Sequence, residues 1–346
     1  MRGQRLLVTF AAVLALAALG CGGSNSNDPD RIQVAYVTNG IDPFWDIAAA
    51  GAAAGAKDFD VECDVLMPPK GIVDQKRMVE GLLTRGTDGI AISPIDAENQ
   101  IDFLNQACEK TNVITQDSDA PDSNRLCFIG VDNYKAGREA GKLVKAALPE
   151  GGGVMILVGR LEQLNAQQRR QGVIDELLDR EEKPIDEITI DPPDATFKGG
   201  RYEIVGTRTD NFDHARAKAN AQDAITSIDN LDCMVGLFAY NAPLILAAVE
   251  EAGKLGEIKI VSFDEAAMTL KGISDGHITG TISQQPFQYG YESVRILAGL
   301  ARGDDTVLPE DGYMEMTAIL VDKENVDEYR AQLKSYGIEH YTAEDE

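Results

Sequence analysis

The sequence predicts an α/β protein with two doubly wound domains in tandem, each a parallel sheet covered by helices on both faces. From Arg31 onward, short β-branched runs alternate with amphipathic stretches, which is typical of such sheets. About 315 of the 346 residues follow an N-terminal leader, more than one hydrophobic core usually supports. No short-period repeat indicates a solenoid.

The first domain is expected to alternate strands and helices up to residue 130. Its first helix, 43–58, carries an Ala/Gly-rich face suited to close packing on the sheet. The expected strands are 32–38, 61–67, 89–93, 113–116 and 126–130, and the other helices are 72–84 and 97–110.

The second domain repeats this rhythm, with one interruption. The stretch 181–200 (EEKPIDEITIDPPDATFKGG) is rich in Pro, Gly and acidic residues and predicts a surface insertion. A strand at 313–322 and a helix at 323–334 come last. The other expected helices are 134–147, 162–180, 213–228 and 243–253, and the strands are 154–158, 203–207, 233–238 and 259–263.

The N-terminus has the features of a signal peptide. Arg2 and Arg5 precede a largely apolar run, 6–19, which is too short to span a bilayer comfortably. The tetrad Ala-Leu-Gly-Cys ending at Cys21 resembles a bacterial lipobox, although an ordinary cleavage site is the alternative. We therefore expect a signal peptide at 1–20, a lipid anchor on Cys21, and a flexible tether to residue 30 (GGSNSNDPD). The mature chain would be a membrane-anchored lipoprotein, periplasmic or otherwise extracytoplasmic.

The composition excludes a nucleic-acid partner. The chain has 57 acidic and 32 basic residues, a formal net charge of −25. This charge opposes nucleic-acid phosphates and anionic lipid surfaces, so the membrane would be reached through the lipid anchor alone.

The four cysteines after Cys21 form no metal-binding pattern. Cys63, Cys108, Cys127 and Cys233 include no CxxC pair and have no histidine at ligand spacing. Most are expected to be small buried hydrophobic residues. Export permits a disulfide, and Cys108 with Cys127 is the candidate pair.

No catalytic constellation is found, so we expect neither an enzyme nor a cofactor nor a metal. The three histidines are scattered, with none in a paired ligand motif. The glycine run 151–153 precedes a strand, whereas a phosphate-binding loop follows a strand and opens a helix. No GxSxG or GxxxxGK[ST] motif occurs.

Polar and aromatic residues instead follow expected strands, where open α/β sheets form their ligand crevice. The segment 39–45 (NGIDPFW) carries two aromatics that read either as core or as a stacking surface for a sugar ring. The triplet 117–119 (DSD) and Asp264 follow two other strands, where acids either bind hydroxyl groups or cap the next helix.

Seven segments resemble, in sequence and order, the sugar-binding periplasmic proteins of ABC importers, of the ribose-, xylose- and galactose-binding kind. The resemblance spans about residues 31–322 and implies the type I periplasmic binding protein fold, with two lobes joined by a three-strand hinge. The segments are VTNGIDPFW, GLLTRGTDGIAISP, ITQDSDAPDS, IGVDN, FAYNAP, VSFDE and ISQQP.

The resemblance implies a sugar pocket built from both lobes. Aromatics would sandwich the ring while carboxylates, a guanidinium and amides hold its hydroxyls. Ser118 stands where ribose binders commonly have an Arg, which argues against a plain copy of the ribose site. The residues implied are Asp42, Phe44, Trp45, Asp117, Ser118, Arg169, Asn241, Asp264 and Gln284, with Phe212 a weaker match.

The resemblance also implies where the chain crosses between lobes: near 131–133, near Gln284, and near 310–313. The N-terminal lobe would comprise 31–130 and 285–312, and the C-terminal lobe 131–284 and 313–346. A sugar that contacts both lobes favours the closed form and so drives closure of the hinge. A membrane permease would then recognise the closed monomer.

Three functions follow in order of preference. The first is capture of a sugar for an ABC transporter permease. The second is a sensor that presents the bound sugar to a chemoreceptor or histidine kinase. The third, an exported sugar-modifying enzyme, ranks last because no catalytic group was found. Sugar-responsive repressors share the fold but carry a DNA-binding segment where this chain has a signal peptide.

Overall fold

The first sheet is parallel throughout and has the strand order β12-β5-β4-β3-β1-β2. The structure is a computed structural model, and it describes residues 31–338, so the predictions for the leader and for Cys21 lie outside the described residues. From Ile32 onward the chain forms one unit. The strands are β1 (Gln33–Val37), β2 (Glu62–Leu66), β3 (Gly89–Ile92), β4 (Asn112–Gln116), β5 (Phe128–Gly130) and β12 (Tyr313–Glu315).

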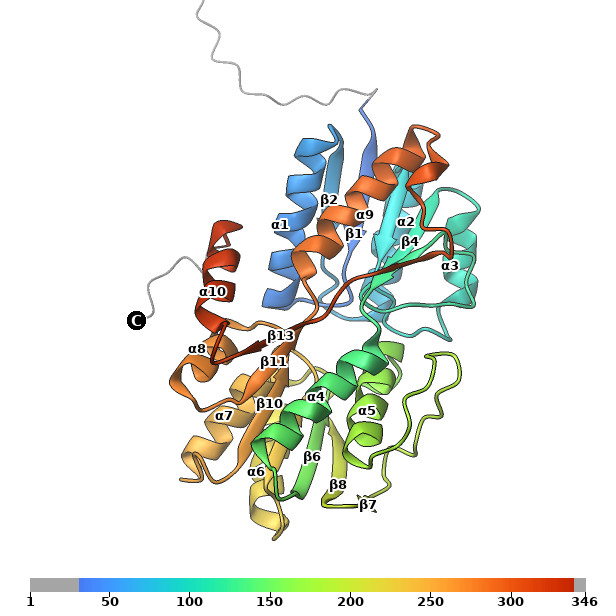
Figure 1. Cartoon of the computed structure of the whole chain (residues 1–346). Coiled ribbons are helices and arrows are strands. Elements are labelled where there is room, and N and C mark those ends of the chain that lie inside the picture. The colour runs from blue at the N-terminus through green and yellow to red at the C-terminus, as the bar shows by residue number, and fades with distance from the viewer. Residues whose placement is uncertain (1–30, 339–346) are drawn as a thin grey trace, which may run out of the picture. The chain divides into compact units, whose positions relative to one another are not determined.

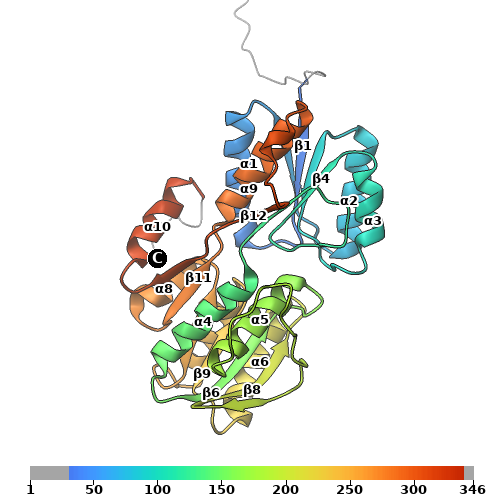
Figure 2. The same ribbon diagram turned by 45° about the vertical axis from the view of Figure 1, so that its right-hand side comes forward.

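Helices cover both faces of this sheet, and together they form the first lobe (Figure 2). One face carries α1 (Pro43–Asp58) and α9 (Pro286–Ala301), and the other carries α2 (Ile72–Arg85) and α3 (Ile101–Cys108). In β1, Val34 and Tyr36 enter the core on the α1 side, whereas Ala35 and Val37 enter the core on the α2 side. A strand buried on both faces explains why β1 reads as a nearly continuous apolar run.

The glycines of α1 pack against α9, where we had expected close packing on the sheet. A Cβ on Gly51 would overlap the carbonyl oxygen of Phe287, and a Cβ on Gly290 would overlap that of Ala48. The two helices therefore approach closely because neither carries a side chain at these crossing points. A short 3₁₀ turn, η1 (Asp305–Val307), follows α9.

The second sheet has the order β13-β11-β10-β9-β6-β8-β7, and only its two edge strands, β13 and β7, are antiparallel to their neighbours. With its helices it forms the second lobe (Figure 1). The strands are β6 (Gly152–Val158), β7 (Phe197–Gly199), β8 (Tyr202–Thr209), β9 (Cys233–Gly236), β10 (Lys259–Phe263), β11 (Gly280–Ser283) and β13 (Ile319–Asp322).

The second sheet also has a core on each face. In β6, Val154, Ile156 and Val158 pack on one side, and Met155 and Leu157 pack on the other. The first core contains α4 (Asn133–Ala147) and α5 (Leu164–Leu177). The second contains α6 (His214–Ser227), α7 (Asn241–Glu251), α8 (Ala267–Asp275) and α10 (Val326–Ser335). This two-sided burial confirms the predicted fold class, two α/β lobes with mostly parallel sheets.

The expected strand 313–322 is wrong as a single element. Tyr313–Glu315 pairs in parallel with β5 of the first sheet, whereas Ile319–Asp322 pairs antiparallel with β11 of the second. The chain therefore passes between the lobes at 316–318, later than the expected 310–313, and Tyr313–Glu315 belongs with the first lobe. The other two passages follow β5, which ends at Gly130, and β11, which ends at Ser283.

The structure also decides two points that the sequence analysis left open. The four described cysteines are free thiols, so Cys108 and Cys127 form no disulfide. No element was predicted for 267–301, which holds α8, β11 and α9.

The segment 181–200 is largely exposed, as expected of an insertion, but its end forms the short strand β7. Arg170 of α5 holds this segment by donating to the carbonyl oxygens of Asp191 and Pro192, each at 2.8 Å. Within 31–338, no helix is long and apolar enough to cross a membrane.

Candidate functional site

A pocket lies between the carboxyl ends of strands from both sheets. It encloses about 380 Å³ of empty space, part of which is open to solvent. The segments after β1, β4, β8, β9, β10 and β11, together with α5, supply its walls. The lining residues are Asn39, Asp42, Phe44, Trp45, Asp117, Arg169, Phe212, Phe238, Ala239, Tyr240, Asp264 and Gln284.

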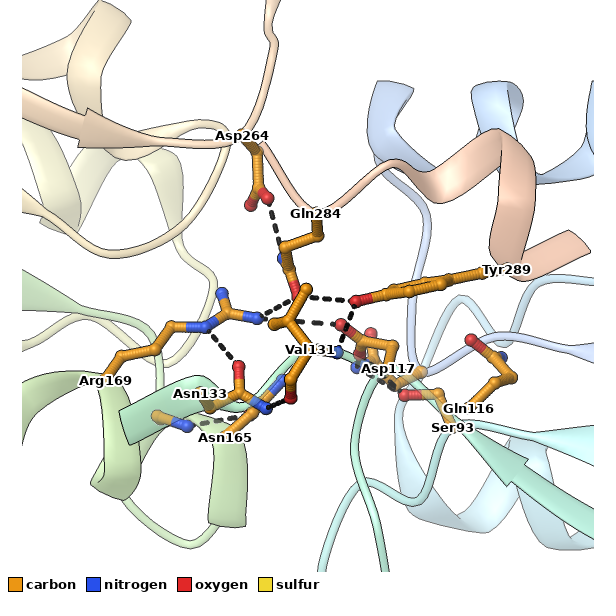
Figure 3. A network of polar contacts seen from close by, with 12 residues as sticks. Ser93, Gln116, Asp117, Val131, Asn133, Asn165, Arg169, Asp264, Gln284 and Tyr289 are labelled. Atoms are coloured by element: carbon orange, nitrogen blue, oxygen red, sulfur yellow. Dashed lines mark hydrogen bonds and ion pairs between the residues drawn. The ribbon is translucent and has the colours of Figure 1, made fainter. Parts of the chain in front are cut away.

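Arg169 lies at the centre of the polar part of the pocket (Figure 3). Its side chain is 1% exposed and donates from Nε to Oδ1 of Asn133 (2.8 Å) and from Nη1 to the carbonyl oxygen of Leu237 (3.1 Å). Nη2 donates to Oε1 of Gln284 at 2.5 Å. The guanidinium also lies over the ring of Phe263, 4.8 Å from its centroid. These contacts fix a buried charge in one orientation.

Asp117 of the first lobe forms an ion pair with this guanidinium. Its Oδ1 is 3.8 Å from Nη2 of Arg169, and its Oδ2 accepts from Ser93 Oγ (2.9 Å) and from Asn39 Nδ2 (3.3 Å). Asp117 follows β4, and Arg169 is on α5 of the second lobe. The ion pair therefore joins the two lobes inside the pocket.

Gln284 links Arg169 to Asp264 and to the first lobe. Its Nε2 donates to Oδ1 of Asp264 at 2.7 Å, and its Oε1 also accepts from the hydroxyl of Tyr289 at 3.3 Å. That hydroxyl accepts from the backbone amide of Val131 at 3.1 Å. Gln284 and Val131 both belong to segments that pass between the lobes, so the pocket network extends into the hinge (Figure 3).

Both central acids leave their strands in the left-handed backbone region, with φ of 61° for Asp117 and 65° for Asp264. Asp is among the residues that tolerate this conformation, and its use turns each carboxylate into the crevice. The alternative interpretation, in which these acids cap the next helix, is wrong: Ala266 occupies the cap position of α8, and Asp132 caps α4.

Burial controls the charges of the two acids. It raises the pKa of Asp264 to about 7, and Arg169 and the bond from Gln284 oppose this rise. Burial also raises the pKa of Asp117, again opposed by Arg169 and by Ser93. With Asp42 included, three carboxyl groups face a single guanidinium among the lining residues. An anionic ligand would therefore meet an excess of acids, whereas hydroxyl groups find acceptors and a donor.

Aromatic side chains form two walls. In the first lobe, Phe44 and Trp45 meet edge to face, with centroids 4.8 Å apart, and both also belong to the core on the α1 side. Asp42 caps α1 by accepting from the amide of Phe44 at 2.9 Å, which sets the start of the helix. The core and stacking interpretations of this segment are therefore compatible.

The second aromatic wall consists of Phe212, Phe238 and Tyr240. Phe212 meets Phe238 edge to face, with centroids 5.5 Å apart, and lies 6.0 Å from the Tyr240 ring. Phe238 and Tyr240 were not among the predicted contacts, nor was Asn39. All three lie in the segments VTNGIDPFW and FAYNAP, so position after a strand was the signal that would have found them.

Two predicted residues lie outside the pocket lining. The side chain of Asn241 turns to Asp210, donating from Nδ2 to Oδ2 at 3.2 Å, and accepts from the amide of Phe238 at 3.1 Å. Ser118 is buried, and its Oγ has no hydrogen-bond partner within the described chain. The remaining predicted residues line the pocket: Asp42, Phe44, Trp45, Asp117, Arg169, Phe212, Asp264 and Gln284.

Comparison with known proteins identifies the family. The family model described as periplasmic binding protein domain matches residues 32–305, which contain every residue that lines the pocket. The chain belongs to this family. This match confirms the predicted resemblance. The expectation that this periplasmic binding protein is not an enzyme is also confirmed, because its relatives are sugar-binding proteins, a family without enzymatic activity.

The names of its relatives refer to the binding of sugars or polyols. The ribose import binding protein of Salmonella typhimurium is 24% identical over 307 residues, 87% of this chain and 94% of the relative. The xylitol-binding protein of Mycolicibacterium smegmatis is 24% identical, over 92% of this chain and 84% of the relative.

Solved structures agree in fold with this periplasmic binding protein. An ABC transporter solute-binding protein from Burkholderia graminis, in complex with D-arabinose, superimposes with a TM-score of 0.75 at 26% identity, covering 85% of this chain and 96% of that one. A sugar-binding protein of a sugar ABC transporter from Bacillus halodurans has a TM-score of 0.72 at 25% identity, covering 86% and 100%.

Proposed function

We propose that this protein captures a small neutral sugar or polyol between its two lobes and delivers it to an ABC transporter permease. The observation that carries the proposal is the buried array of Asp117, Arg169, Asp264 and Gln284 between two aromatic walls. Carboxylates and a guanidinium bind hydroxyl groups through charge-assisted hydrogen bonds, while aromatic faces stack on the apolar faces of a sugar ring. The names of the relatives, which include ribose, allose and xylitol binding, support the same ligand class.

The ligand is inferred to be uncharged. Asp42, Asp117 and Asp264 outnumber the single lining guanidinium of Arg169, and the pKa of Asp264 already lies near neutrality because of burial. A phosphorylated or carboxylated sugar would add a negative charge next to these acids. Its desolvation would be costly without a matching cation.

Closure follows from the arrangement of the network. Asp117 is supplied by the first lobe and Arg169 by the second, and Gln284 lies where the chain passes between them. A sugar bound to Asp117 and Asp264 together would contact both lobes and so stabilise the closed form over the open one. A permease would then distinguish the loaded from the empty protein.

The ligand is tested first by calorimetry and thermal shift against D-ribose, D-arabinose, D-allose, xylitol and the 5-phosphate of ribose. Binding raises the melting temperature according to RT ln(1 + [L]/Kd). We expect at least one neutral compound to bind and the phosphate not to bind. Preferential binding of the phosphate, or no binding by any neutral sugar or polyol, would contradict the proposal.

The transport role is tested by uptake of the radiolabelled sugar in cells with and without this chain. Loss of uptake supports delivery to a permease. Normal uptake combined with loss of a chemotactic or transcriptional response would favour the sensor function instead.

We further propose that the chain is exported and anchored through Cys21 as a monomeric lipoprotein. The apolar run 6–19 and the lipobox-like tetrad support this. Metabolic labelling with a fatty acid should mark the wild-type protein and not Cys21→Ser. Labelling of both proteins, or of neither, would contradict the anchor.

A further inference from the structure

Asp210 lies directly after β8 (Tyr202–Thr209), behind the second aromatic wall. Its side chain is fully buried, and the residue is not among those that line the pocket. Its backbone amide donates to the carbonyl oxygen of Val158, which ties the segment to β6. A buried carboxylate at this position has to be satisfied by nearby donors.

Two of the three donors to this carboxylate belong to the aromatic wall, and the third is Asn241. Oδ1 of Asp210 accepts from the backbone amide of Phe212 at 2.8 Å and from the hydroxyl of Tyr240 at 2.5 Å. Oδ2 accepts from Nδ2 of Asn241 at 3.2 Å. Asn241 in turn accepts from the backbone amide of Phe238 at 3.1 Å. The carboxylate therefore reaches all three aromatic residues of the wall, two directly and one through Asn241.

The backbone around Phe212 depends on such support. Asn211 and Phe212 both have positive φ, 59° and 62°, which is costly for a bulky aromatic residue. Gly159 leaves the space that this conformation requires, because a Cβ there would come within 2.7 Å of the Phe212 ring and 3.0 Å of the Tyr240 hydroxyl. The position of the Phe212 ring therefore depends on its own strained backbone and on the absence of a side chain at Gly159.

We propose that Asp210 is a positioning residue, which holds Phe212, Phe238 and Tyr240 as one preformed wall and so sets the affinity and the sugar selectivity of the pocket. This inference rests on the proposed sugar-binding function. Asp210 acts through the aromatic residues and does not itself contact the sugar. A wall ordered before binding spares the entropy of ordering it on binding, and its fixed shape discriminates between ring substituents.

The test compares Asp210→Asn with Asp213→Asn. The first change replaces one acceptor oxygen by an NH₂ group, so the carboxamide cannot accept from all three donors. Asp213 lies in the same segment, is exposed, and caps α6 by accepting from the amide of Arg216, a role that Asn also fills. The Kd values for D-ribose, D-arabinose, D-allose and xylitol are measured by calorimetry for the wild type and both variants.

We expect Asp210→Asn to weaken the tightest of these ligands by about tenfold or more and to change the ratio of Kd values between ligands by about threefold or more. Asp213→Asn should leave the values and their ratios unchanged. Unchanged Kd values in Asp210→Asn would overturn the inference. So would a uniform weakening of all ligands with a lowered melting temperature, which is what a purely structural role predicts.

If Asp210→Asn does not fold, Tyr240→Phe decides, because it keeps the ring and removes only the hydroxyl that donates to Asp210. A changed Kd ratio supports the inference, and an unchanged ratio overturns it. Failure of the proposed function looks different, since the wild-type protein itself would then bind none of the four ligands.

Discussion

Arg169 and Gln284 lie 115 positions apart in the chain and are joined by a 2.5 Å hydrogen bond from Nη2 to Oε1 in the buried centre of the pocket. Arg169 stands on α5 of the second lobe, and Gln284 stands where the chain returns to the first lobe. The bond couples the proposed sugar site to the hinge, because any rotation at Gln284 also moves an acceptor of the central guanidinium.

Replacing Arg169 should greatly weaken sugar binding. Arg169→Met removes the cation from among the lining residues and leaves Asp117 and Asp264 facing each other without it. We expect sugar affinity to fall by about 100-fold or more, and stability to fall by about 3–5 kcal/mol, the usual cost of breaking a buried ion pair. Calorimetry and denaturant unfolding measure the two effects. Sugar binding close to that of the wild type would remove Arg169 from the site.

Replacing the adjacent Arg170 should leave sugar binding intact and loosen the 181–200 segment instead. Arg170 donates to Thr207 Oγ1 at 2.8 Å and to two carbonyl oxygens of that segment. Arg170→Met should therefore make the segment more susceptible to limited proteolysis, with the sugar Kd unchanged. It serves as the matched control for Arg169→Met, and a loss of binding equal to that of Arg169→Met would show that the two roles are not separate.

Sugar binding should change the fluorescence of Trp45, the single tryptophan of the chain. The indole lines the pocket and lies edge to face with Phe44. A sugar ring stacked beside it alters its environment, so emission should shift during titration and saturate with the calorimetric Kd. If heat is released on binding while emission stays constant, Trp45 does not contact the ligand. Trp45→Phe should abolish the signal.

The ligand-free protein should become less stable as the pH rises from about 5 to 7. The pKa of Asp264 is about 7 in the folded protein and 3.8 as its ordinary value, because burial disfavours the charged form. Between these values the folded state binds more protons than the unfolded state, so the stability that is full below about pH 4 is lost as the pH approaches 7. Burial also raises the pKa of Asp117 and of Glu265, in the same direction.

We expect the melting temperature to fall by on the order of a few °C over this range. Asp264→Asn removes the carboxyl group whose pKa is about 7 in the folded protein, and it should therefore flatten the dependence of the melting temperature on pH. Differential scanning fluorimetry without sugar measures both. A melting temperature that rises with pH over the same interval would contradict the assignment.

The order of elements could be predicted well from the sequence because it depends on local pattern. Helix 43–58 and strand 259–263 were predicted with the bounds that α1 and β10 have in the structure. The positions directly after strands, including Asp117 and Asp264, were recognisable for the same reason. Parallel strands end at one edge of a sheet, so residues after them face a common crevice.

Strand pairing could not be predicted in this way. The run 313–322 has one β-rich pattern, yet its two halves join different sheets, because each half pairs with whichever edge strand lies beside it. Nothing within the run itself marks the passage at 316–318. Whether Cys108 and Cys127 pair was left open by the sequence for a related reason: distance in space is set by the packing of whole elements, and both thiols are free.

Local pattern and family resemblance were therefore enough to indicate two parallel-sheet lobes and an acid-rich crevice. The packed fold alone determined which side chains meet. Successive residues on a helix point about 100° apart, so Arg169 enters the pocket while Arg170 faces the 181–200 segment. Asn241 likewise turns from the pocket to Asp210, because a buried carboxylate from a distant strand offers it an acceptor that no local pattern reveals.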